Sequence, residues 1–505
     1  MKEIKRALIS VYNKDGILEI AKILADNGVE ILSTGGTYNF LQENSIPVTS
    51  VESITGYPSI LGGRVKTLHP KIFGGILNRR DNNTDILEIS EYNIPAIDLV
   101  IVDLYPFEEY VAANATHNEI IEKIDIGGIS LIRGAAKNYN DVVIIPSKDS
   151  YKPLLNILKE KGCNTTIEER EYFAAQAFLV SSHYDTAIFN FFNTKFEIQA
   201  FKKSILNAKT LRYGENPHQK GIYYGCSDSL PKQLHGKEIS HNNLLDVEAA
   251  IELISDFTEI TVGIIKHNNA CGCASAPTVK EAWEKALAAD PVSAFGGIIV
   301  TNKEISKETA ELMNKIFFEV IIAPAYTEEA LEILKSKKNR IILESINIKL
   351  TDKKFRSLLG GVLVQDRDSY VETPADLKPV TQKQPRPNEI DDLLFANKLV
   401  KHSKSNAIVL VKGKQLLASG IGQTSRVDSL KQAIQKAKSF NFSLNGAVMS
   451  SDAFFPFADC VEIAAAEGIK TVIQPGGSIR DNDSVEYCNK NDIAMVMTGI
   501  RHFKH

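Results

Sequence analysis

The chain has 505 residues, of which 44% are hydrophobic and 24% charged, and its formal net charge is -4. This balance is typical of a folded globular protein, and the mild acidity argues against nonspecific binding to nucleic acid. No apolar run approaches the roughly 20 residues of a membrane-spanning helix, and the first residues lack the apolar stretch of a signal peptide. We therefore expect a cytoplasmic protein of two or three domains whose six cysteines are free, buried thiols.

The first part of the chain alternates apolar, strand-like segments with amphipathic helical ones. Strands are predicted at 6–11, 29–33, 97–104 and 142–146, and helices at 15–27, 149–161 and 168–192. In the first helix, Ile17, Ile20, Ala21 and Leu24 share one face. This alternation predicts a parallel sheet with right-handed crossovers.

A polar stretch at 193–210 is the best candidate for a domain boundary. Helices are then predicted at 243–257, 278–289, 306–318, 327–337, 390–402, 426–438 and 482–491, and strands at 261–265, 297–301, 319–323, 361–365, 407–412, 415–420, 469–474 and 493–498. The Pro-rich segment 373–388 indicates a linker or a long surface crossing. The chain is therefore of the α/β class throughout.

Polar residues and glycines follow the first two predicted strands, where ligands bind in open α/β sheets. Ser10, Tyr12, Asn13 and Lys14 follow the first strand, and Thr34, Gly35, Gly36 and Thr37 follow the second. Glycines let backbone N–H groups approach an anion, and a helix start adds partial positive charge. This pattern predicts a phosphate site, and a plain turn is the alternative.

A basic loop supports the phosphate interpretation. Residues 62–76 concentrate Arg64, Lys66, His69 and Lys71 among glycines, which is typical of an anion pocket or of a solvated loop. The sequence contains neither a P-loop nor a GxGxxG fingerprint, so P-loop NTPases and ordinary dinucleotide-binding domains are excluded.

Two further groups of residues suggest acid–base chemistry. Tyr105, Asp125 and Lys137 could serve proton transfer, whereas a structural Asp125–Lys137 ion pair is the alternative. Lys266 and His267 end an apolar strand, where the imidazole can accept an amine proton and the cation can stabilise an oxyanion. A surface Lys–His pair is the alternative for this second group.

Four other segments are candidates for ligand contact. Residues 211–219 (LRYGENPHQ) form a dense polar loop, and 293–297 (SAFGG) allow close backbone approach. Residues 452–459 place three aromatic rings beside two carboxylates, as in a stacking slot or a helix start over the core. The tail 501–505 is basic, and either binds a phosphate or is frayed.

These segments together resemble the bifunctional AICAR transformylase/IMP cyclohydrolase family of purine biosynthesis. The resemblance runs from Ser10 to His505. Its most specific pieces are GGRVKTLHPKI at 62–72, IDIGG at 124–128, AAKN at 135–138, LRYGENPHQ at 211–219, DPVSAFGG at 290–297, SDAFFPFAD at 451–459, PGGSIRD at 475–481 and TGIRHFKH at 498–505.

The resemblance implies two activities. One transfers the formyl group of 10-formyltetrahydrofolate, a co-substrate, to the 5-amino group of 5-aminoimidazole-4-carboxamide ribonucleotide. The other closes the formylated product to inosine monophosphate with loss of water. The implied fold is a methylglyoxal synthase-like domain over residues 1–196 and a transformylase domain over 197–505. The second domain would hold two cytidine deaminase-like subdomains without zinc or another metal, with a crossing near 373–390. A homodimer with a shared transferase site is implied as well.

The resemblance also assigns roles to single residues. In the transferase, His267 resembles the general base on the amine, and Lys266 the group that stabilises the tetrahedral intermediate. Its substrates would be held by Arg212, Tyr213, Gly296, Asn406, Arg426, Phe454, Asp459 and Arg501. Ring closure in the cyclohydrolase would use Lys66, Tyr105, Asp125 and Lys137. Its nucleotide would be bound by Ser10, Lys14, Thr34, Gly35, Gly36, Arg64 and Thr67, to which the strand-end pattern adds Tyr12, Asn13 and Thr37.

Four positions depart from the family's usual pattern. Ala270 replaces Pro, Asp103 replaces Asn, Phe73 replaces His and Lys504 replaces Arg. Three hypotheses therefore stand: the two-activity enzyme, a transformylase with an impaired cyclohydrolase domain, and a non-catalytic nucleotide-binding sensor. Retention of the acid–base residues favours the first, because a sensor needs only the anion pocket.

Overall fold

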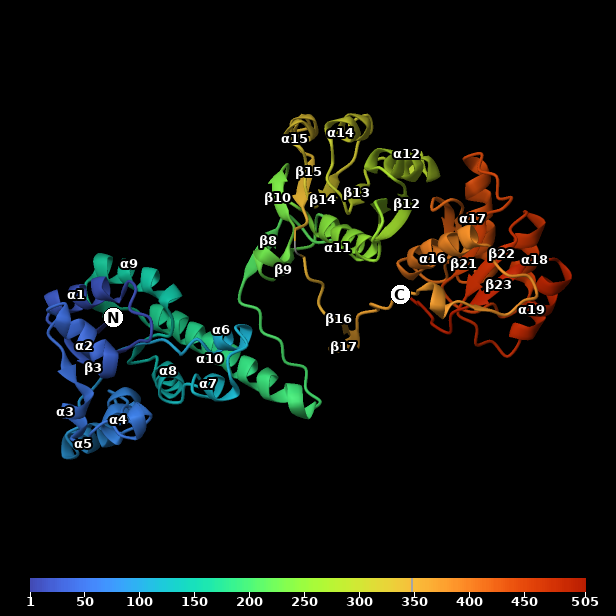
Figure 1. Cartoon of the computed structure of the whole chain (residues 1–505). Helices are drawn as coiled ribbons and strands as arrows, with labels where there is room; N and C mark the ends of the chain where they lie inside the picture. Colours follow the sequence, from blue (N-terminus) through green and yellow to red (C-terminus); the bar gives the residue numbers. More distant parts are fainter. Residues whose placement is uncertain (347) are drawn as a thin grey trace. The chain divides into compact units, whose positions relative to one another are not determined.

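The computed structural model describes residues 1–346 and 348–505 (Figure 1). The chain forms two units, Met1–Leu206 and Asn207–His505, and each has its own sheets and its own core. The boundary falls within the polar stretch at 193–210, after the long helix α10 (Ile167–Phe196).

The first unit is built on a five-stranded sheet of order β4-β3-β2-β5-β6, and every neighbouring pair in it is parallel. The strands are β2 (Arg6–Ser10), β3 (Glu30–Ser33), β4 (Thr49–Ser50), β5 (Leu99–Val102) and β6 (Val143–Ile145). All of β5 is buried, as expected of a strand covered on both faces. The predicted parallel sheet is confirmed.

Helices connect these strands and cover the sheet. They are α1 (Ile17–Asp26), α2 (Gly35–Glu43), α3 (Val51–Thr55), α4 (Pro70–Leu77), α5 (Asn83–Glu91), α6 (Phe107–Ala112), α7 (His117–Ile121), α8 (Gly127–Lys137), α9 (Tyr151–Lys161) and α10. In α1 the predicted residues Ile17, Ile20, Ala21 and Leu24 are the buried ones. A separate two-stranded ladder pairs β1 (Lys2–Glu3) with β7 (Asn164–Thr165).

The second unit contains two six-stranded sheets with the same strand order. The first runs β10-β15-β14-β13-β11-β12, and the second runs β18-β23-β22-β21-β19-β20. In each sheet the second, third and fourth strands of this order are parallel to one another, and the remaining neighbouring pairs are antiparallel. The second unit is therefore two copies of one mixed α/β subdomain.

The strands of the first copy are β10 (Lys232–His235), β11 (Thr261–Lys266), β12 (Asn269–Ser275), β13 (Ile298–Thr301), β14 (Val320–Ala323) and β15 (Ile341–Glu344). Those of the second are β18 (Lys378–Pro379), β19 (Ile408–Val411), β20 (Leu416–Gly420), β21 (Val448–Ser451), β22 (Thr471–Gln474) and β23 (Ala494–Met497). A small ladder of β8 (Ala208–Leu211) and β9 (Gly221–Tyr224) precedes them.

Helices lie on both faces of each sheet. The first copy has α11 (His241–Ser255), α12 (Val279–Ala289), α13 (Pro291–Ala294), α14 (Lys307–Met313) and α15 (Glu328–Lys335), and the second has α16 (Pro387–Lys401), α17 (Arg426–Ser439), α18 (Asp459–Ala466) and α19 (Asp481–Lys490). Figure 1 shows α12, α14 and α15 on the side of the first sheet away from α11. The helices α11 and α16 share one core cluster that joins the two copies.

The two copies meet along β12 and β20. Ala274 and Gln415 form a bridge, and the Ser275 N–H donates to the Lys414 carbonyl at 2.9 Å. The turn between β19 and β20 is fixed by Asp392 of α16, which accepts the N–H groups of Gly413 and Lys414 at 2.8 and 2.7 Å. Lys414 then pairs with Glu259, just before β11, at 2.7 Å, which closes this end of the junction.

The structure corrects one predicted strand of the second unit and adds five to its two six-stranded sheets. The apolar segment 361–365 forms β17 (Gly361–Asp366), an exposed arm with β16 (Lys353–Leu358) rather than a core strand, because neither sheet packs against it. The added strands are β10, β12, β15, β18 and β21. Four of them have at most four residues, and β12 (NACGCAS) consists mostly of small residues without an alternating pattern, so none gives a strand signal in the sequence.

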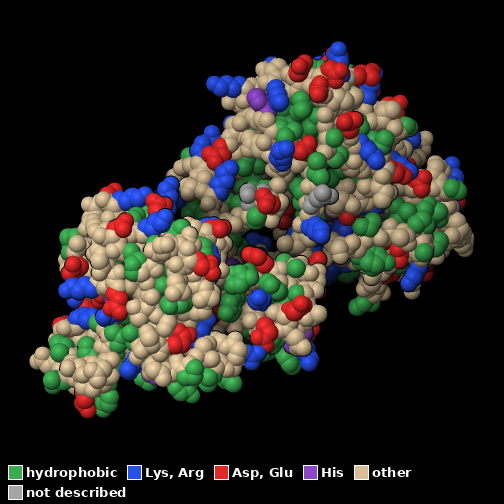
Figure 2. All heavy atoms as spheres, turned by 60° about the vertical axis from the view of Figure 1, so that its left-hand side comes forward, with side chains coloured by type: hydrophobic (Ala, Val, Ile, Leu, Met, Phe, Trp, Pro, Cys, Tyr) green, Lys and Arg blue, Asp and Glu red, His purple; other side chains and the backbone are tan. Residues whose placement is uncertain are grey.

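Among the described residues, none of the helices has the length and apolar character needed to cross a bilayer. All six cysteines are free; four are buried, Cys226 is exposed and Cys271 is partly buried, so the prediction of uniformly buried thiols was wrong at these two positions. On the face drawn in Figure 2, basic and acidic side chains are interspersed rather than separated by sign.

Candidate active sites

The carboxyl ends of β2, β3 and β5 meet at one edge of the first sheet. Ile9 is paired with Ser33, and Ser10 with Val102. The turn after β3 enters α2 through Gly35, whose φ is +56°, and Lys66 lies over it, since a Cβ built on Gly35 would come 3.2 Å from Lys66 Nζ. The structure thus brings the basic loop onto the glycine turn, which is the arrangement an anion pocket requires.

Lys14 contributes a second cation to this edge. Its ammonium donates to the carbonyls of Val11 and Tyr12. Burial, the largest influence, lowers the pKa of Lys14; Asp103 opposes this effect and Lys66 adds to it. Two neighbouring cations beside a helix start favour a negatively charged ligand.

Asp103, one of the departures from the family pattern, holds the loop after β2. Its two carboxylate oxygens accept the backbone N–H groups of Tyr12 and of Asn13, the latter at 2.9 Å. Burial raises the pKa of Asp103, against the lowering effect of these two hydrogen bonds. The side chain of the asparagine usual at this position has only one acceptor oxygen. The carboxylate of Asp103 has two, and each accepts one of the two consecutive N–H groups.

Tyr105 and Asp125 lie beside this pocket. Burial raises the pKa of Tyr105, and the charge of Asp125 raises it further. Burial also raises the pKa of Asp125, while the Gly128 N–H, which donates to it at 2.5 Å, and the nearby Lys66 lower it. These electrostatic contacts place Lys66, Tyr105 and Asp125, three of the four residues predicted to serve ring closure, near one another.

Sequence reasoning missed Lys123. Its ammonium lies over three aromatic rings, at 5.6 Å from the centroid of Tyr12, 5.7 Å from that of Tyr105 and 4.5 Å from that of Tyr110. The rings of Tyr12 and Tyr105 also meet edge to face, with centroids 5.5 Å apart. The only feature of the sequence that could have indicated a functional role for Lys123 is its position just before the IDIGG segment, which is a weak signal.

Lys137 lies at the end of α8 opposite Asp125. It is the exposed last residue of α8, whose 11 residues separate it from the Asp125 end by about 15 Å. The alternative of a structural Asp125–Lys137 ion pair was therefore wrong. The part of Lys137 in ring closure stays a prediction.

The other predicted residues of this site divide into exposed and structural positions. Arg64 is exposed and pairs with Glu122. Thr37 is buried, and its hydroxyl donates to the Val11 carbonyl at 2.9 Å and accepts the Val11 N–H at 3.1 Å. The Thr34 hydroxyl donates to Glu52 at 3.0 Å, and Thr67 lies against Gly127.

In the second unit, His267 occupies a two-residue turn between β11 and β12. Lys266 is paired with Asn269, and the two central residues have φ angles of 52° and 62°. This is the left-handed geometry of a tight hairpin, which histidine and asparagine adopt more readily than most residues. The turn leaves the His267 side chain exposed at its tip.

Three contacts hold this turn although Ala270 replaces the usual proline. Asp246 of α11 accepts the Asn268 N–H at 2.6 Å. The Asn269 side chain donates to the His267 carbonyl at 2.8 Å and accepts the Lys404 N–H of the second copy at 3.0 Å. Burial raises the pKa of Asp246, against the effects of the Asn268 hydrogen bond and of His267.

Lys266 connects the turn to the segment before β13. Its ammonium donates to the Phe295 carbonyl at 2.8 Å, and Gly296, with φ +74°, follows that residue. Across the junction, the Asn406 side chain donates to the Gln423 carbonyl at 3.0 Å. Through Asn269 and Lys404, the structure brings Lys266, His267, Gly296 and Asn406 to one boundary between the copies.

Other predicted residues of the second unit make local contacts. Arg426 is buried, where it donates to the Ser451 hydroxyl at 2.8 Å and to Asp452 at 2.6 Å. The carboxylate of Asp459 accepts the N–H of Cys460, and Phe454 is half-buried. The exposed Arg212 lies over the ring of Tyr213 at 4.9 Å, and Arg501 over that of Phe503 at 4.5 Å.

The C-terminal tail is anchored rather than frayed. His502, which is 2% exposed, shares hydrogen bonds with Asp368 at 2.6 Å and with Glu372 at 2.8 Å. Its N–H donates to the Asp452 carbonyl at 3.0 Å. The neighbouring Arg501 is thereby held at a fixed place at the end of the chain.

One unit gathers cations, a glycine turn and acid–base groups, and the other presents a Lys–His turn at a subdomain junction. These features are typical of an α/β enzyme. Comparison with known proteins agrees with this class. A family model described as "AICARFT/IMPCHase bienzyme" matches residues 135–436, and one described as "MGS-like domain" matches residues 16–130. The chain belongs to the AICARFT/IMPCHase bienzyme family.

Relatives match along the full length. "Bifunctional purine biosynthesis protein PurH" of Bacteroides thetaiotaomicron is 65% identical over 504 residues, covering 100% of this chain and 99% of the relative. The protein of the same name from Persephonella marina is 47% identical, covering 99% of this chain and 100% of the relative. A solved structure titled "Crystal structure of ForH" is 34% identical, with a TM-score of 0.33, and covers 37% of this chain and 96% of that one.

Membership of this family defines the activity. The enzyme is a transferase and a hydrolase that carries out the two final steps of IMP biosynthesis, with 10-formyltetrahydrofolate as co-substrate of the formyl transfer. Its N-terminal domain is methylglyoxal synthase-like.

Proposed function

We propose that the first domain, predicted over residues 1–196, closes the ring to IMP, and that the second, over 197–505, transfers the formyl group. The single observation that carries this division is that each unit holds its own acid–base group. Lys66, Tyr105 and Asp125 belong to one unit, and Lys266 and His267 to the other. Folds of this class support many chemistries, so the side chains rather than the fold support the assignment.

In the cyclohydrolase, the anion pocket binds the nucleotide phosphate at the start of α2, with Lys14 and the N–H groups of Gly35 and Gly36. The carboxamide nitrogen then attacks the formyl carbon, and Lys66 stabilises the negative charge that develops on the formyl oxygen. Asp125 accepts the proton of the attacking nitrogen, and Tyr105, whose raised pKa keeps its hydroxyl protonated at neutral pH, protonates the resulting oxyanion. Asp125 then passes its proton to this hydroxyl, which leaves as water, and the tyrosinate accepts the proton of the formamido nitrogen, so both side chains return to their starting states.

In the transferase, His267 accepts the proton of the 5-amino group as that nitrogen attacks the formyl carbon of the folate. Lys266 donates a hydrogen bond to the resulting oxyanion, as it does to the Phe295 carbonyl in the absence of substrate. Collapse of the intermediate returns the proton to the leaving folate nitrogen. Arg212, Tyr213, Gly296, Asn406 and Arg501 hold the ribonucleotide.

Paired single substitutions test this division. His267→Ala should abolish formyl transfer and leave cyclisation of added formylated nucleotide intact, and Lys66→Ala should do the reverse. His235→Ala, at a half-buried histidine of β10 in the first copy, is the matched control and should change neither activity. Loss of both activities in a folded His267→Ala protein would contradict separate sites.

We also propose that the enzyme is a cytoplasmic homodimer. The arm formed by β16 and β17 exposes apolar side chains, with Leu359 99%, Leu363 58% and Val364 46% exposed. Patches of this kind are typical of protein–protein contacts. Replacement of Leu359 and Leu363 by serine should shift the mass measured by light scattering from dimer to monomer, and a monomeric unsubstituted protein would contradict the proposal. Six free cysteines support a reducing compartment.

A further inference from the structure

The ammonium of Lys123 lies among aromatic rings rather than beside a carboxylate. Its nitrogen is 4.5 Å from the ring centroid of Tyr110, 5.6 Å from that of Tyr12 and 5.7 Å from that of Tyr105. The neighbouring Glu122 pairs with Arg64 instead, and no ion pair joins Lys123 to a carboxylate of the described residues. Because aromatic rings attract a cation without neutralising it, this cage of three tyrosines keeps a full positive charge beside Tyr105.

A buried tyrosine of α10 fixes the segment that carries Lys123. Tyr184 is 6% exposed, and its ring packs on that of Phe107 with centroids 6.1 Å apart. Its hydroxyl accepts the Asp125 N–H at 2.8 Å and donates to the Lys123 carbonyl at 2.5 Å. One hydroxyl group therefore holds the backbone of Lys123 and that of Asp125, so the cation and the proposed base are carried by one fixed segment.

The charge of Lys123 also acts on the hydroxyl of Tyr105. Burial, the largest influence, raises the pKa of Tyr105 and Asp125 raises it further, whereas Lys123 lowers it. A phenol that is partly buried beside a carboxylate gives up its proton reluctantly, because both surroundings disfavour the tyrosinate. Lys123 opposes both effects from the same side of the cage that its distances define.

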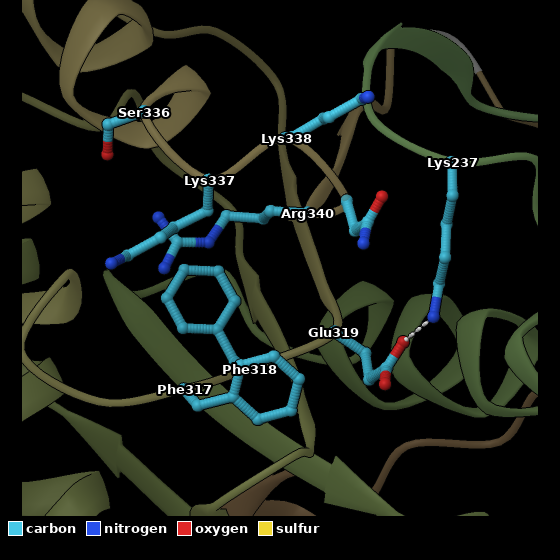
Figure 3. Close-up of a pocket in the computed structure, with 9 residues that line it drawn as sticks. Lys237, Phe317, Phe318, Glu319, Ser336, Lys337, Lys338 and Arg340 are labelled. Atoms are coloured by element: carbon cyan, nitrogen blue, oxygen red, sulfur yellow. Dashed lines mark ion pairs between the residues drawn. The ribbon is translucent and has the colours of Figure 1, made fainter.

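A cation over a ring can also serve packing alone, and the second unit contains such a case. Arg340, in the cleft drawn in Figure 3, is 4% exposed, and its guanidinium lies 3.9 Å from the ring centroid of Phe318. Hydrogen bonds to the Asn314 side chain at 2.8 Å and to the Leu334 carbonyl at 3.2 Å hold it in place. Lys123 is only half-buried, and one of its rings belongs to a proposed proton donor, so packing alone does not account for it.

We propose that Lys123 is a positioning residue of the cyclohydrolase that stabilises the tyrosinate of Tyr105 during ring closure. The inference rests on the function proposed for Tyr105. After Tyr105 has protonated the oxyanion, its own oxygen stays negative until it takes the proton of the formamido nitrogen. The caged ammonium lowers the free energy of this state by its charge, and it neither gives nor takes a proton.

The test measures cyclisation of added formylated nucleotide after two substitutions of Lys123. Lys123→Met removes the charge and keeps a long side chain between the rings, so kcat should fall roughly three- to thirtyfold while KM for the nucleotide is unchanged. Lys123→Arg keeps a cation over the rings and should restore most of the rate. Lys202→Met is the matched control, because Lys202 also lies over a ring, 5.1 Å from the centroid of Phe189, and should keep the full rate.

A double-substitution cycle shows whether Lys123 acts through Tyr105. In the Tyr105→Phe background, Lys123→Met should cause no further loss of kcat, because no tyrosinate forms there. An equal additional loss in that background, an unchanged kcat in Lys123→Met, or equal losses in the Met and Arg variants would overturn the proposal. Unchanged ring closure in Tyr105→Phe alone would refute the function proposed for Tyr105 instead, so the two failures are distinguishable.

Discussion

The buried pair of Arg426 and Asp452 gives the sharpest prediction about stability. Asp452 is 0% exposed in its side chain, and one of its carboxylate oxygens has no hydrogen-bond partner. Its charge therefore depends on the 2.6 Å contact with Arg426. Arg426→Ala leaves that carboxylate buried and unpaired, which costs about 3–5 kcal/mol of unfolding free energy.

The assay uses the single tryptophan of the chain. Trp283 is 1% exposed in α12 of the second unit, so its fluorescence follows unfolding of that unit in urea. The double variant Arg426→Met/Asp452→Leu removes both charges and should recover most of the loss, because no unpaired charge remains. A cost below about 1 kcal/mol for Arg426→Ala would refute the reasoning, since a cost that small is typical of an exposed pair.

Two further predictions concern positioning and pH. Asp246→Ala should lower kcat for formyl transfer roughly ten- to hundredfold, because it releases the Asn268 N–H that holds the His267 turn. Asp246→Asn should restore most of the rate, and cyclisation should be unchanged in both variants. Equal loss of formyl transfer in both variants would contradict a positioning role. Burial lowers the pKa of His502, but hydrogen bonds and charges from its two carboxylate partners outweigh this and raise the pKa to about 9. Because the folded pKa lies above the unfolded one, the stabilisation is complete below about pH 6.5 and is lost as pH rises through 9. The unfolding free energy of the unsubstituted protein, measured by urea titration, should therefore fall over that interval by an amount on the order of 3 kcal/mol more than that of His502→Gln.

Periodicity and strand-end chemistry explain what the sequence could predict. The buried face of α1 and the fully buried β5 follow from apolar spacing, and Lys66 over Gly35 follows from the rule that ligands bind beyond strand ends. The first two features depend only on residues that are close in the sequence. The third depends on the fact that the carboxyl ends of parallel strands lie at the same edge of a sheet.

Long-range contacts explain what the sequence could not predict. Nothing near Arg426 in the chain indicates that its guanidinium pairs with a carboxylate at the end of β21, and nothing near Lys123 indicates three rings around its ammonium. The repeat of the two sheets was expected from the family resemblance and not from the residue pattern, because the same topology is built from different residues and most of its strands are only four residues long.

The repeat has a consequence for how many sites one chain can hold. An aspartate on the preceding helix fixes the hairpin tip in both copies, Asp246 in the first and Asp392 in the second. The first tip carries His267 and stays open, whereas the second carries Gly413 and Lys414 and is locked onto Glu259. Two hairpins of one topology thus differ in what their tips contact: the first leaves exposed the histidine proposed as general base, and the second ties the two copies together, so one chain offers one such hairpin to a substrate.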